Sequence, residues 1–192
     1  MNTVIFLDID GVLCTQRSVL AYDNPKSWDP TCCFMIRRLC LKYDCKIVIS
    51  STWKHDPSLS SYLTVHEFIP FMWQDFIDWK TPNSPGINDK RGDDIKLWLD
   101  KHPEVNQYVI IDDDSDMHTN QLPFLIKTKY DDGFSAKNYI DCEKLLKGEK
   151  RDVPLQICPL CEAEASRVMG FPWDQCLRCG HVYKPKEEYD VQ

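Results

Sequence analysis

The chain has 192 residues, of which 43% are hydrophobic and 28% charged, a composition typical of a soluble globular protein with one core of ordinary size and a small appendage. No apolar stretch approaches the roughly 18 to 20 residues of a membrane span, and no secretory signal is visible, so we expect a cytoplasmic protein without a membrane partner. The net charge of −7 argues against a tight, non-specific nucleic-acid binder. An enzyme that binds the end of a nucleic-acid strand briefly needs only positively charged side chains around its metal site.

An apolar run near the N-terminus predicts a buried strand over residues 3–9, and this run leads into acidic residues. Residues i and i+2 of an extended segment point the same way, so Asp8 and Asp10 can face one ligand together. Gly11 then supplies the freedom for a sharp turn. A solvated acidic turn is the ordinary interpretation of Asp-Gly, but the preceding buried strand favours a functional site.

The next segments alternate between irregular and regular patterns. Residues 14–28 lack periodicity, so we expect a loop or small flap there. Asp29 and Pro30 are typical of a helix start, as N-cap and first-turn residue, and helical spacing of apolar residues follows to Tyr43. Residues 46–50 predict a second buried strand.

The middle of the chain is rich in aromatic residues between positions 58 and 79, where Pro70 interrupts any single helix. These aromatics could offer stacking surfaces for bases, but burial against the sheet is the favoured interpretation. The remaining elements are a helix over 93–101, strands over 107–111 and 124–126, and a helix from Ser135 that stops at Gly148.

Strands that alternate with helices predict a Rossmann-like parallel α/β sheet with helices on both faces, over residues 1–148, with the functional site at the carboxyl ends of the strands. The third strand ends in Asp112 and Asp113, which this topology brings near Asp8 and Asp10. Clustered carboxylates repel one another unless a cation neutralises them. The sequence therefore predicts a Mg²⁺ site suited to phosphoryl transfer.

Residues 8–13 (DIDGVL) resemble motif I of the haloacid dehalogenase superfamily, and the resemblance spans roughly residues 1–148. It implies a phosphatase in which Asp8 is the nucleophile that becomes an aspartyl-phosphate. Asp10 would protonate the leaving group and then activate water. The chemistry is consistent with these roles, because a carboxylate nucleophile divides one difficult displacement into two easier ones, and a second nearby carboxyl can act as general acid and base.

Motifs II and III of that superfamily have two candidates each in this chain. Motif II is a Ser or Thr directly after the second apolar strand, where Ser50 matches best and Ser51 is next. Motif III is a basic residue at the start of a later helix, which counters charge on the transferring group. We favour Lys90 for this role, with Arg91 as a rival that the spacing cannot separate from it.

Motif IV is the acidic pair that, with motif I, would hold Mg²⁺. Asp112 with Asp113 matches its adjacent form, and Asp112 with Asp116 matches its D-x-x-x-D form. Because Mg²⁺ takes one or two protein carboxylates plus water and phosphate oxygens, not all of these aspartates can be ligands. We expect Asp8, the backbone carbonyl of Asp10 and Asp112 to bind it, with Asp113 helping directly or through water.

Two segments narrow the resemblance further: residues 50–53 (SSTW) and 91–95 (RGDDI). They are similar to the branch associated with RNA repair proteins, which is itself similar to the 3′-phosphatase half of polynucleotide kinase–phosphatases. Motifs I and II lie too close together for a large cap, and an uncapped site can admit a polymer end. The favoured substrate is thus a 3′-phosphate on a DNA or RNA end, or a nucleotide. The alternatives are a phosphatase of a small phosphorylated metabolite and a catalytically silent binding scaffold.

Two C-x-x-C pairs near the C-terminus, with fourteen residues between them, predict a zinc ribbon over residues 156–186, after a linker at 149–155. Four thiolates leave no open coordination position, so structural Zn²⁺ is favoured over a redox dithiol. The ribbon is not basic, so a protein partner or a purely structural role is as plausible as nucleic-acid binding. The predicted ligands are Cys158, Cys161, Cys176 and Cys179.

Overall fold

A computed structural model describes residues 2–85, 90–149, 174–175 and 182–183. The chain divides into two units, Met1–Arg151 and Asp152–Gln192. In the second unit the described part is one antiparallel pair of short strands, β5 (Asp174–Gln175) and β6 (Val182–Tyr183). The four predicted zinc ligands lie outside the described residues, as does nearly all of the predicted linker. Among the described helices, none is long and apolar enough to cross a membrane.

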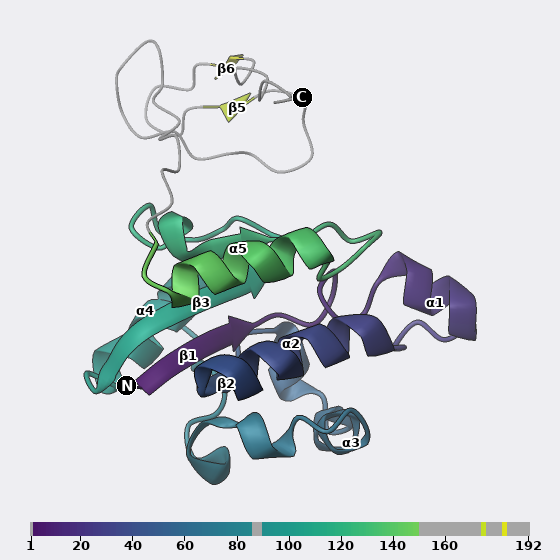
Figure 1. Ribbon diagram of the computed structural model, residues 1–192. Coiled ribbons are helices and arrows are strands. Elements are labelled where there is room, and N and C mark those ends of the chain that lie inside the picture. Colours follow the sequence, from purple (N-terminus) through teal and green to yellow (C-terminus); the bar gives the residue numbers. More distant parts are fainter. Residues whose placement is uncertain (1, 86–89, 150–173, 176–181, 184–192) are drawn as a thin grey trace. The chain divides into compact units, whose positions relative to one another are not determined.

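Four parallel strands form the sheet of the first unit, in the order β2-β1-β3-β4 (Figure 1). β1 is central, and its Phe6 lies beside Val48 on one side and Ile110 on the other. The chain moves from β1 to one neighbour and then crosses to the other, so a topological switch point lies at the carboxyl ends of β1 and β3. The strands are β1 (Asn2–Leu7), β2 (Cys45–Ile49), β3 (Val105–Asp112) and β4 (Leu125–Lys127).

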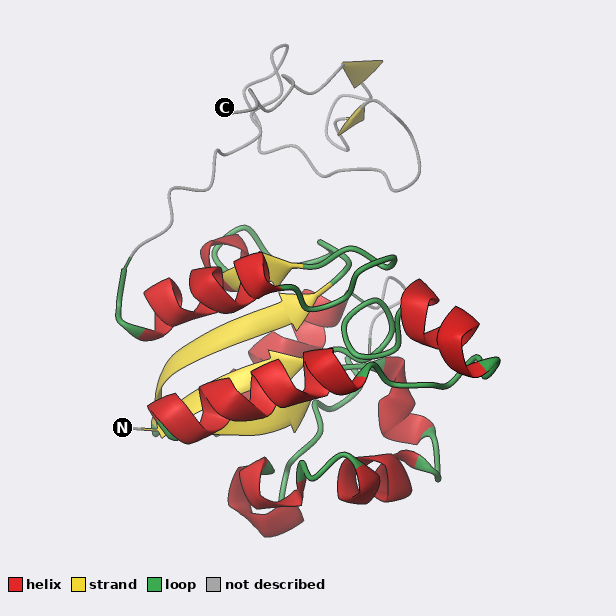
Figure 2. Cartoon of the chain, turned by 45° about the vertical axis from the view of Figure 1, so that its right-hand side comes forward, coloured by secondary structure: helices red, strands yellow, loops and turns green. Residues whose placement is uncertain are grey.

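Helices cover both faces of this sheet, as Figure 2 shows. Alternate side chains of β1 point to opposite faces, so two cores form. On one face Ile5 packs in a core with residues of α2 (Pro30–Tyr43) and α5 (Ala136–Leu146). On the other face Phe6 packs with α4 (Arg91–Lys101). The predicted parallel α/β fold of the first unit is confirmed.

Polar caps fix where two of these helices begin. The Asp29 carboxylate accepts a hydrogen bond from the Thr31 amide at 2.8 Å, as expected for the N-cap of α2. Ser135 caps α5 and exchanges hydrogen bonds with Asn138. Both helix starts were predicted from these residue types, and both predictions are confirmed.

Residues 14–28 were expected to form a loop or small flap; a wholly irregular loop is wrong, because this stretch contains helix α1 (Gln16–Tyr22). Its only buried member is Ser18, so no apolar stripe marks it. A capping box between Thr15 and Ser18 stabilises its first turn, and the Ser18 hydroxyl also donates to the Ser27 carbonyl at 2.6 Å. Local polar contacts therefore hold this helix, and hydrophobic periodicity cannot reveal it.

The aromatic-rich segment is broken into short pieces, as the position of Pro70 predicts. Phe68 and Trp73 are buried in the two cores, which supports a packing role for these rings. The short helices of this segment are α3 (Leu59–Val65), η2 (Ile69–Phe71) and η3 (Trp73–Phe76). Two further short helices lie outside it, η1 (Thr52–His55) and η4 (Leu122–Phe124).

Candidate active site

Three carboxylates meet at the carboxyl ends of β1 and β3. Asp8 follows β1, Asp112 ends β3 and Asp113 comes next; one oxygen of each lies within 4.8 Å of the others. Asp8 and Asp112 are buried, and Asp113 is partly buried. The Asp8 amide donates to the Ile111 carbonyl at 3.0 Å, which fixes the two strand ends together. The structure thus brings together the side chains of Asp8, Asp112 and Asp113, which are three of the four residues predicted to bind Mg²⁺.

Gly11 permits this approach. Its φ angle is +68°, a conformation that side chains disfavour, and a Cβ atom there would lie 2.2 Å from Oδ2 of Asp113. The turn after β1 therefore requires glycine for two independent reasons, one conformational and one steric.

Arg91 is the basic residue of the cluster. Its Nη1 lies 2.9 Å from Oδ1 of Asp8 and 2.5 Å from the Ser50 carbonyl oxygen, and its Nε lies 2.9 Å from Oδ2 of Asp112. Lys90, the adjacent N-cap of α4, is exposed. The preference for Lys90 over Arg91 is therefore not supported by this placement. Which of two neighbouring side chains turns inward depends on how the helix docks, and spacing does not show that.

The carboxylates are crowded enough to shift their protonation. Burial raises the pKa of Asp8 to about 6, although the Arg91 guanidinium and a hydrogen bond from Ser51 oppose the shift. Burial and the neighbouring charge of Asp8 raise the pKa of Asp112 well above its usual range. Burial also raises the pKa of Asp113. One guanidinium does not offset three carboxylates, so the cluster favours a further cation.

The donor set fits Mg²⁺. Carboxylate oxygens are the ligands that this ion prefers. Oδ2 of Asp112 is buried, and among the described residues no N–H group is aimed at it well enough to form a hydrogen bond, despite the nearby Arg91 Nε. A buried carboxylate oxygen in this state has a free lone pair for a metal ion.

Ser50 and Ser51 differ in what their hydroxyls do. The Ser51 hydroxyl bonds Asp8 and accepts from the Trp53 amide at 3.3 Å. The Ser50 hydroxyl is buried and has no hydrogen-bond partner among the described residues. It lines a pocket of about 290 Å³ that also includes Arg91 and Lys54. Ser50 therefore remains available to a ligand, in line with its favoured match to motif II.

Asp10 is exposed, but it is not free. Its Oδ2 accepts a hydrogen bond from Nε1 of Trp53 at 2.9 Å. Trp53 is buried and packs edge-on against Trp28 and Tyr62. No role for Trp53 could be predicted from its spacing along the chain, although a buried indole N–H normally requires an acceptor and the Asp10 carboxylate can supply one.

Asp116 has a different position from the three clustered carboxylates. Its Oδ2 accepts from the Arg91 amide at 3.0 Å, and its carbonyl accepts from the Gly92 amide at 3.3 Å. It thereby binds the first turn of α4 and holds Arg91 in place. Of the two matches to motif IV, the structure brings Asp112 together with Asp113 in the carboxylate cluster.

Lys54 is a second residue to which the sequence analysis gave no role. Its Nζ is buried and lies 2.7 Å from Asp94 of α4 and 3.1 Å from the Pro82 carbonyl oxygen. A buried ion pair of this kind is weak evidence of stability but fixes geometry. It connects the segment after Ser50 to the helix that carries Arg91.

A parallel sheet with carboxylates at its switch point and a basic residue from a following helix defines the class, a phosphatase-type hydrolase of the haloacid dehalogenase superfamily. Residues 4–139 match the family described as the HAD domain in Swiss Army Knife RNA repair proteins, and the chain belongs to this family. Neither the curated proteins nor the solved structures include a significant match to the chain. Membership of the superfamily, predicted from residues 8–13, is confirmed.

Proposed function

We propose that this protein is a Mg²⁺-dependent phosphomonoesterase that removes a 3′-phosphate from a nucleic-acid end through an aspartyl-phosphate intermediate. The observation that carries the proposal is the cluster of Asp8, Asp112 and Asp113 beside Arg91. Mg²⁺ would be held by the Asp8 and Asp112 carboxylates and the Asp10 carbonyl, with Asp113 helping directly or through water, and when bound it would neutralise charge on the carboxylates and the phosphoryl oxygens.

The first step is attack of an Asp8 oxygen on phosphorus. The bond from phosphorus to the ester oxygen breaks, and Asp10 gives its proton to the departing hydroxyl. Arg91 and the unpaired Ser50 hydroxyl would donate hydrogen bonds to the phosphoryl oxygens. In the second step Asp10 takes a proton from water, which attacks the aspartyl-phosphate and releases inorganic phosphate and free Asp8.

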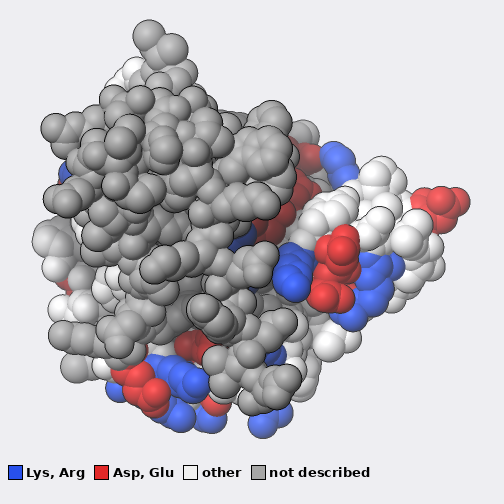
Figure 3. All heavy atoms as spheres, turned by 90° about the horizontal axis from the view of Figure 1, so that it is seen from above, with Lys and Arg blue, Asp and Glu red and all other residues white. Residues whose placement is uncertain are grey.

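Three observations favour a polymeric substrate. The family is named for RNA repair proteins. Between β1 and α2 the chain holds one seven-residue helix instead of a cap domain. Asp10, the proposed proton donor, is exposed. Acidic and basic side chains lie interspersed among the described residues visible in Figure 3, and the net charge is −7, so binding to a strand would depend on local contacts.

The test is turnover with Mg²⁺ on a 3′-phosphorylated oligonucleotide, a 5′-phosphorylated one, mononucleotides and sugar phosphates, with the Asp8→Asn variant alongside. We expect the 3′-phosphorylated oligonucleotide to have the highest kcat/KM and the variant to be inactive. Full activity of Asp8→Asn would exclude the covalent mechanism. A lead of about tenfold for sugar phosphates or mononucleotides would replace the substrate with a small metabolite. Absence of turnover on every substrate would favour the binding scaffold.

A further inference from the structure

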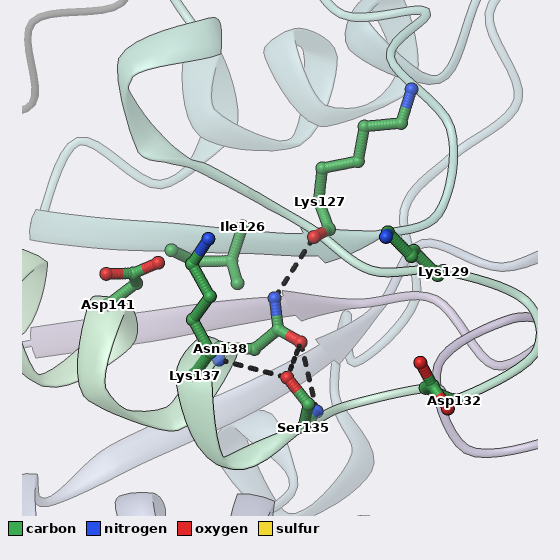
Figure 4. Close-up of a pocket in the computed structure, with 9 residues that line it drawn as sticks. Ile126, Lys127, Lys129, Asp132, Ser135, Lys137, Asn138 and Asp141 are labelled. Atoms are coloured by element: carbon green, nitrogen blue, oxygen red, sulfur yellow. Dashed lines mark hydrogen bonds between the residues drawn. The ribbon is translucent and has the colours of Figure 1, made fainter. Parts of the chain in front are cut away.

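A second pocket, of about 290 Å³, lies where β4 ends and α5 begins (Figure 4). Its walls are held together by the α5 cap, because Ser135 and Asn138 bond each other and Nδ2 of Asn138 donates to the Lys127 carbonyl at 3.0 Å. Neither proposed catalytic carboxylate, Asp8 or Asp10, lines it.

Three lysines line this pocket: Lys127, Lys129 and Lys137, which we call the lysine pocket. All three are exposed, and none forms an ion pair with a described carboxylate. Five other described lysines do form such pairs, namely Lys26, Lys42, Lys54, Lys96 and Lys144. The Lys127 ammonium donates to the Ser115 hydroxyl at 3.3 Å, outside the lining, so Lys129 and Lys137 are the pocket lysines whose ammonium groups have no partner among the described residues. Ammonium groups without a carboxylate partner produce a local positive potential even on an acidic protein.

Two acidic residues, Asp132 and Asp141, also line the lysine pocket. Asp141 has its own partner, since an oxygen of its carboxylate lies 3.9 Å from Nζ of Lys144. The lysines therefore outnumber the carboxylates of the lining, and the excess charge is positive. The ligand that this charge favours is an anion.

The lysine pocket lies next to the candidate active site. Lys127 of β4 is in register with Asp112 of β3, which places them about 4.8 Å apart, the spacing of neighbouring strands. The next residue, Thr128, donates from its amide to the Asp112 carbonyl at 2.9 Å and from its hydroxyl to the Gly11 carbonyl at 2.7 Å. A ligand at the carboxylate cluster and an anion at the lysines would thus both lie at the carboxyl ends of the strands.

We propose that the lysine pocket binds an internal phosphodiester group of a nucleic-acid strand whose terminal phosphate lies at Asp8. This inference rests on the proposed function and deepens it, because it explains how an acidic protein would prefer a strand over a mononucleotide. Lysines act as point charges toward phosphate, so this contact gives affinity without sequence preference.

The test variant is Lys129→Gln/Lys137→Gln, which removes two charges and leaves Lys127, the neighbour of Asp112, in place. The matched control is Lys101→Gln/Lys147→Gln. Lys101 ends α4 and Lys147 follows α5, both residues are exposed, and neither lines the lysine pocket. The substrates are 3′-phosphorylated oligonucleotides from a dinucleotide to a dodecamer, and p-nitrophenyl phosphate. Equal thermal midpoints establish that both variants are folded.

For the unaltered protein we expect kcat/KM to rise with oligonucleotide length. In the lysine-pocket variant this rise should largely disappear, and the slope of log kcat/KM against log salt should become shallower by about 0.7, since a single strand releases about 0.7 counterion per neutralised phosphate and the pocket binds one phosphodiester group. Turnover of p-nitrophenyl phosphate should not change. The control variant should keep both the length dependence and the salt slope.

Equal length dependence in the two variants overturns the inference while leaving the phosphatase intact. Absence of turnover of every oligonucleotide and of p-nitrophenyl phosphate in the unaltered protein instead refutes the proposed function. The pocket is then tested by fluorescence anisotropy with a labelled dodecamer, in which equal affinity of the two variants overturns the inference and weaker binding of the lysine-pocket variant supports it.

Discussion

At the scale of single residues, Trp53 is the contact that most affects how Asp10 would work. Asp10 is exposed, and an exposed carboxylate samples several rotamers unless a neighbour holds it. The Trp53 indole supplies that neighbour at 2.9 Å from a buried and therefore rigid position. Trp53 is thus a positioning residue that acts through Asp10.

Replacement of Trp53 by Phe should lower kcat/KM, which reports the step that forms the aspartyl-phosphate, about tenfold for a nucleoside 3′-phosphate, whose leaving group needs a proton, and much less for p-nitrophenyl phosphate, whose leaving group does not. The control is Trp73→Phe, because Trp73 is also buried but its Nε1 has no hydrogen-bond partner among the described residues. An equal loss on both substrates would indicate damaged packing and contradict the positioning role.

Arg91 and Lys90 offer a second residue-scale prediction. Arg91→Ala should reduce kcat/KM by about a hundredfold or more, because the guanidinium faces Asp8 and Asp112 with two different nitrogens. Arg91→Lys should recover little of this, since an ammonium group cannot reproduce that fork. Lys90→Ala, at the exposed neighbouring position, serves as the control and should remain close to the unaltered protein in steady-state kinetics.

At the scale of elements, α4 is the helix whose placement determines the site. Gly92 lies in its first turn, where an added Cβ would approach the His118 amide nitrogen to 2.7 Å and Oε1 of Gln121 to 2.6 Å. The Gln121 side chain in turn donates to the Gly92 carbonyl at 2.9 Å. The first turn of α4 therefore docks against the segment after β3 without room for a side chain.

Gly92→Ala tests this docking by the sign of its effect. Helix propensity alone predicts stabilisation by roughly 1 kcal/mol. The close contacts predict the reverse, a lower thermal midpoint, together with reduced kcat/KM as Arg91 moves with the turn. Calorimetry and steady-state kinetics measure the two effects. A raised midpoint with unchanged kinetics would show that the segment after β3 yields freely.

The elements also show what a sequence does and does not reveal. The four strands of the parallel sheet could be predicted because each contains an apolar run, and the start of α2 because Asp29 is a typical N-cap. Helix α1 could not, because its cap and its Ser18 contact are polar and local. The choice of Arg91 over Lys90 and the bond between Trp53 and Asp10 depend on tertiary docking, which spacing along the chain does not encode.

At the scale of the whole molecule, the core is rich in thiols. Burial raises the pKa of Cys14 and Cys32 to about 11 and that of Cys45 to about 12. A raised thiol pKa keeps the group protonated as the pH rises, so at pH 8 about one thiol in a thousand is ionised where the pKa is about 11. The described cysteines, all buried, are Cys14, Cys32, Cys33, Cys40, Cys45 and Cys142.

Iodoacetamide at pH 8 should therefore leave these six cysteines unmodified in the native protein and modify them in denaturant, as peptide mass spectrometry would show. Protection should persist well above pH 9 and fail only as the pH approaches the raised pKa values or the fold opens. Rapid native labelling of Cys14 would contradict the buried position that the structure gives it.

The four C-terminal cysteines give a separate prediction that rests on the sequence. Purified protein should contain about one Zn²⁺ per chain. Cys176→Ser should lose it, whereas Cys142→Ser, which changes a buried cysteine of α5, should retain it. Elemental analysis measures both. Full zinc content in Cys176→Ser would refute the ribbon.

The two outer strands of the sheet, β2 and β4, determine whether it can associate with another chain by strand pairing. An exposed strand edge presents unpaired amide and carbonyl groups that can recruit another chain. Along β2 the Ile49 amide donates to the Trp79 carbonyl and the Ile49 carbonyl accepts from the Thr81 amide, so the segment near residue 80 occupies that side. At the other side β4 is three residues long and ends in Lys127. The sheet is therefore poorly suited to grow by strand addition, which protects a chain with a thiol-rich apolar interior from aggregating through its edges.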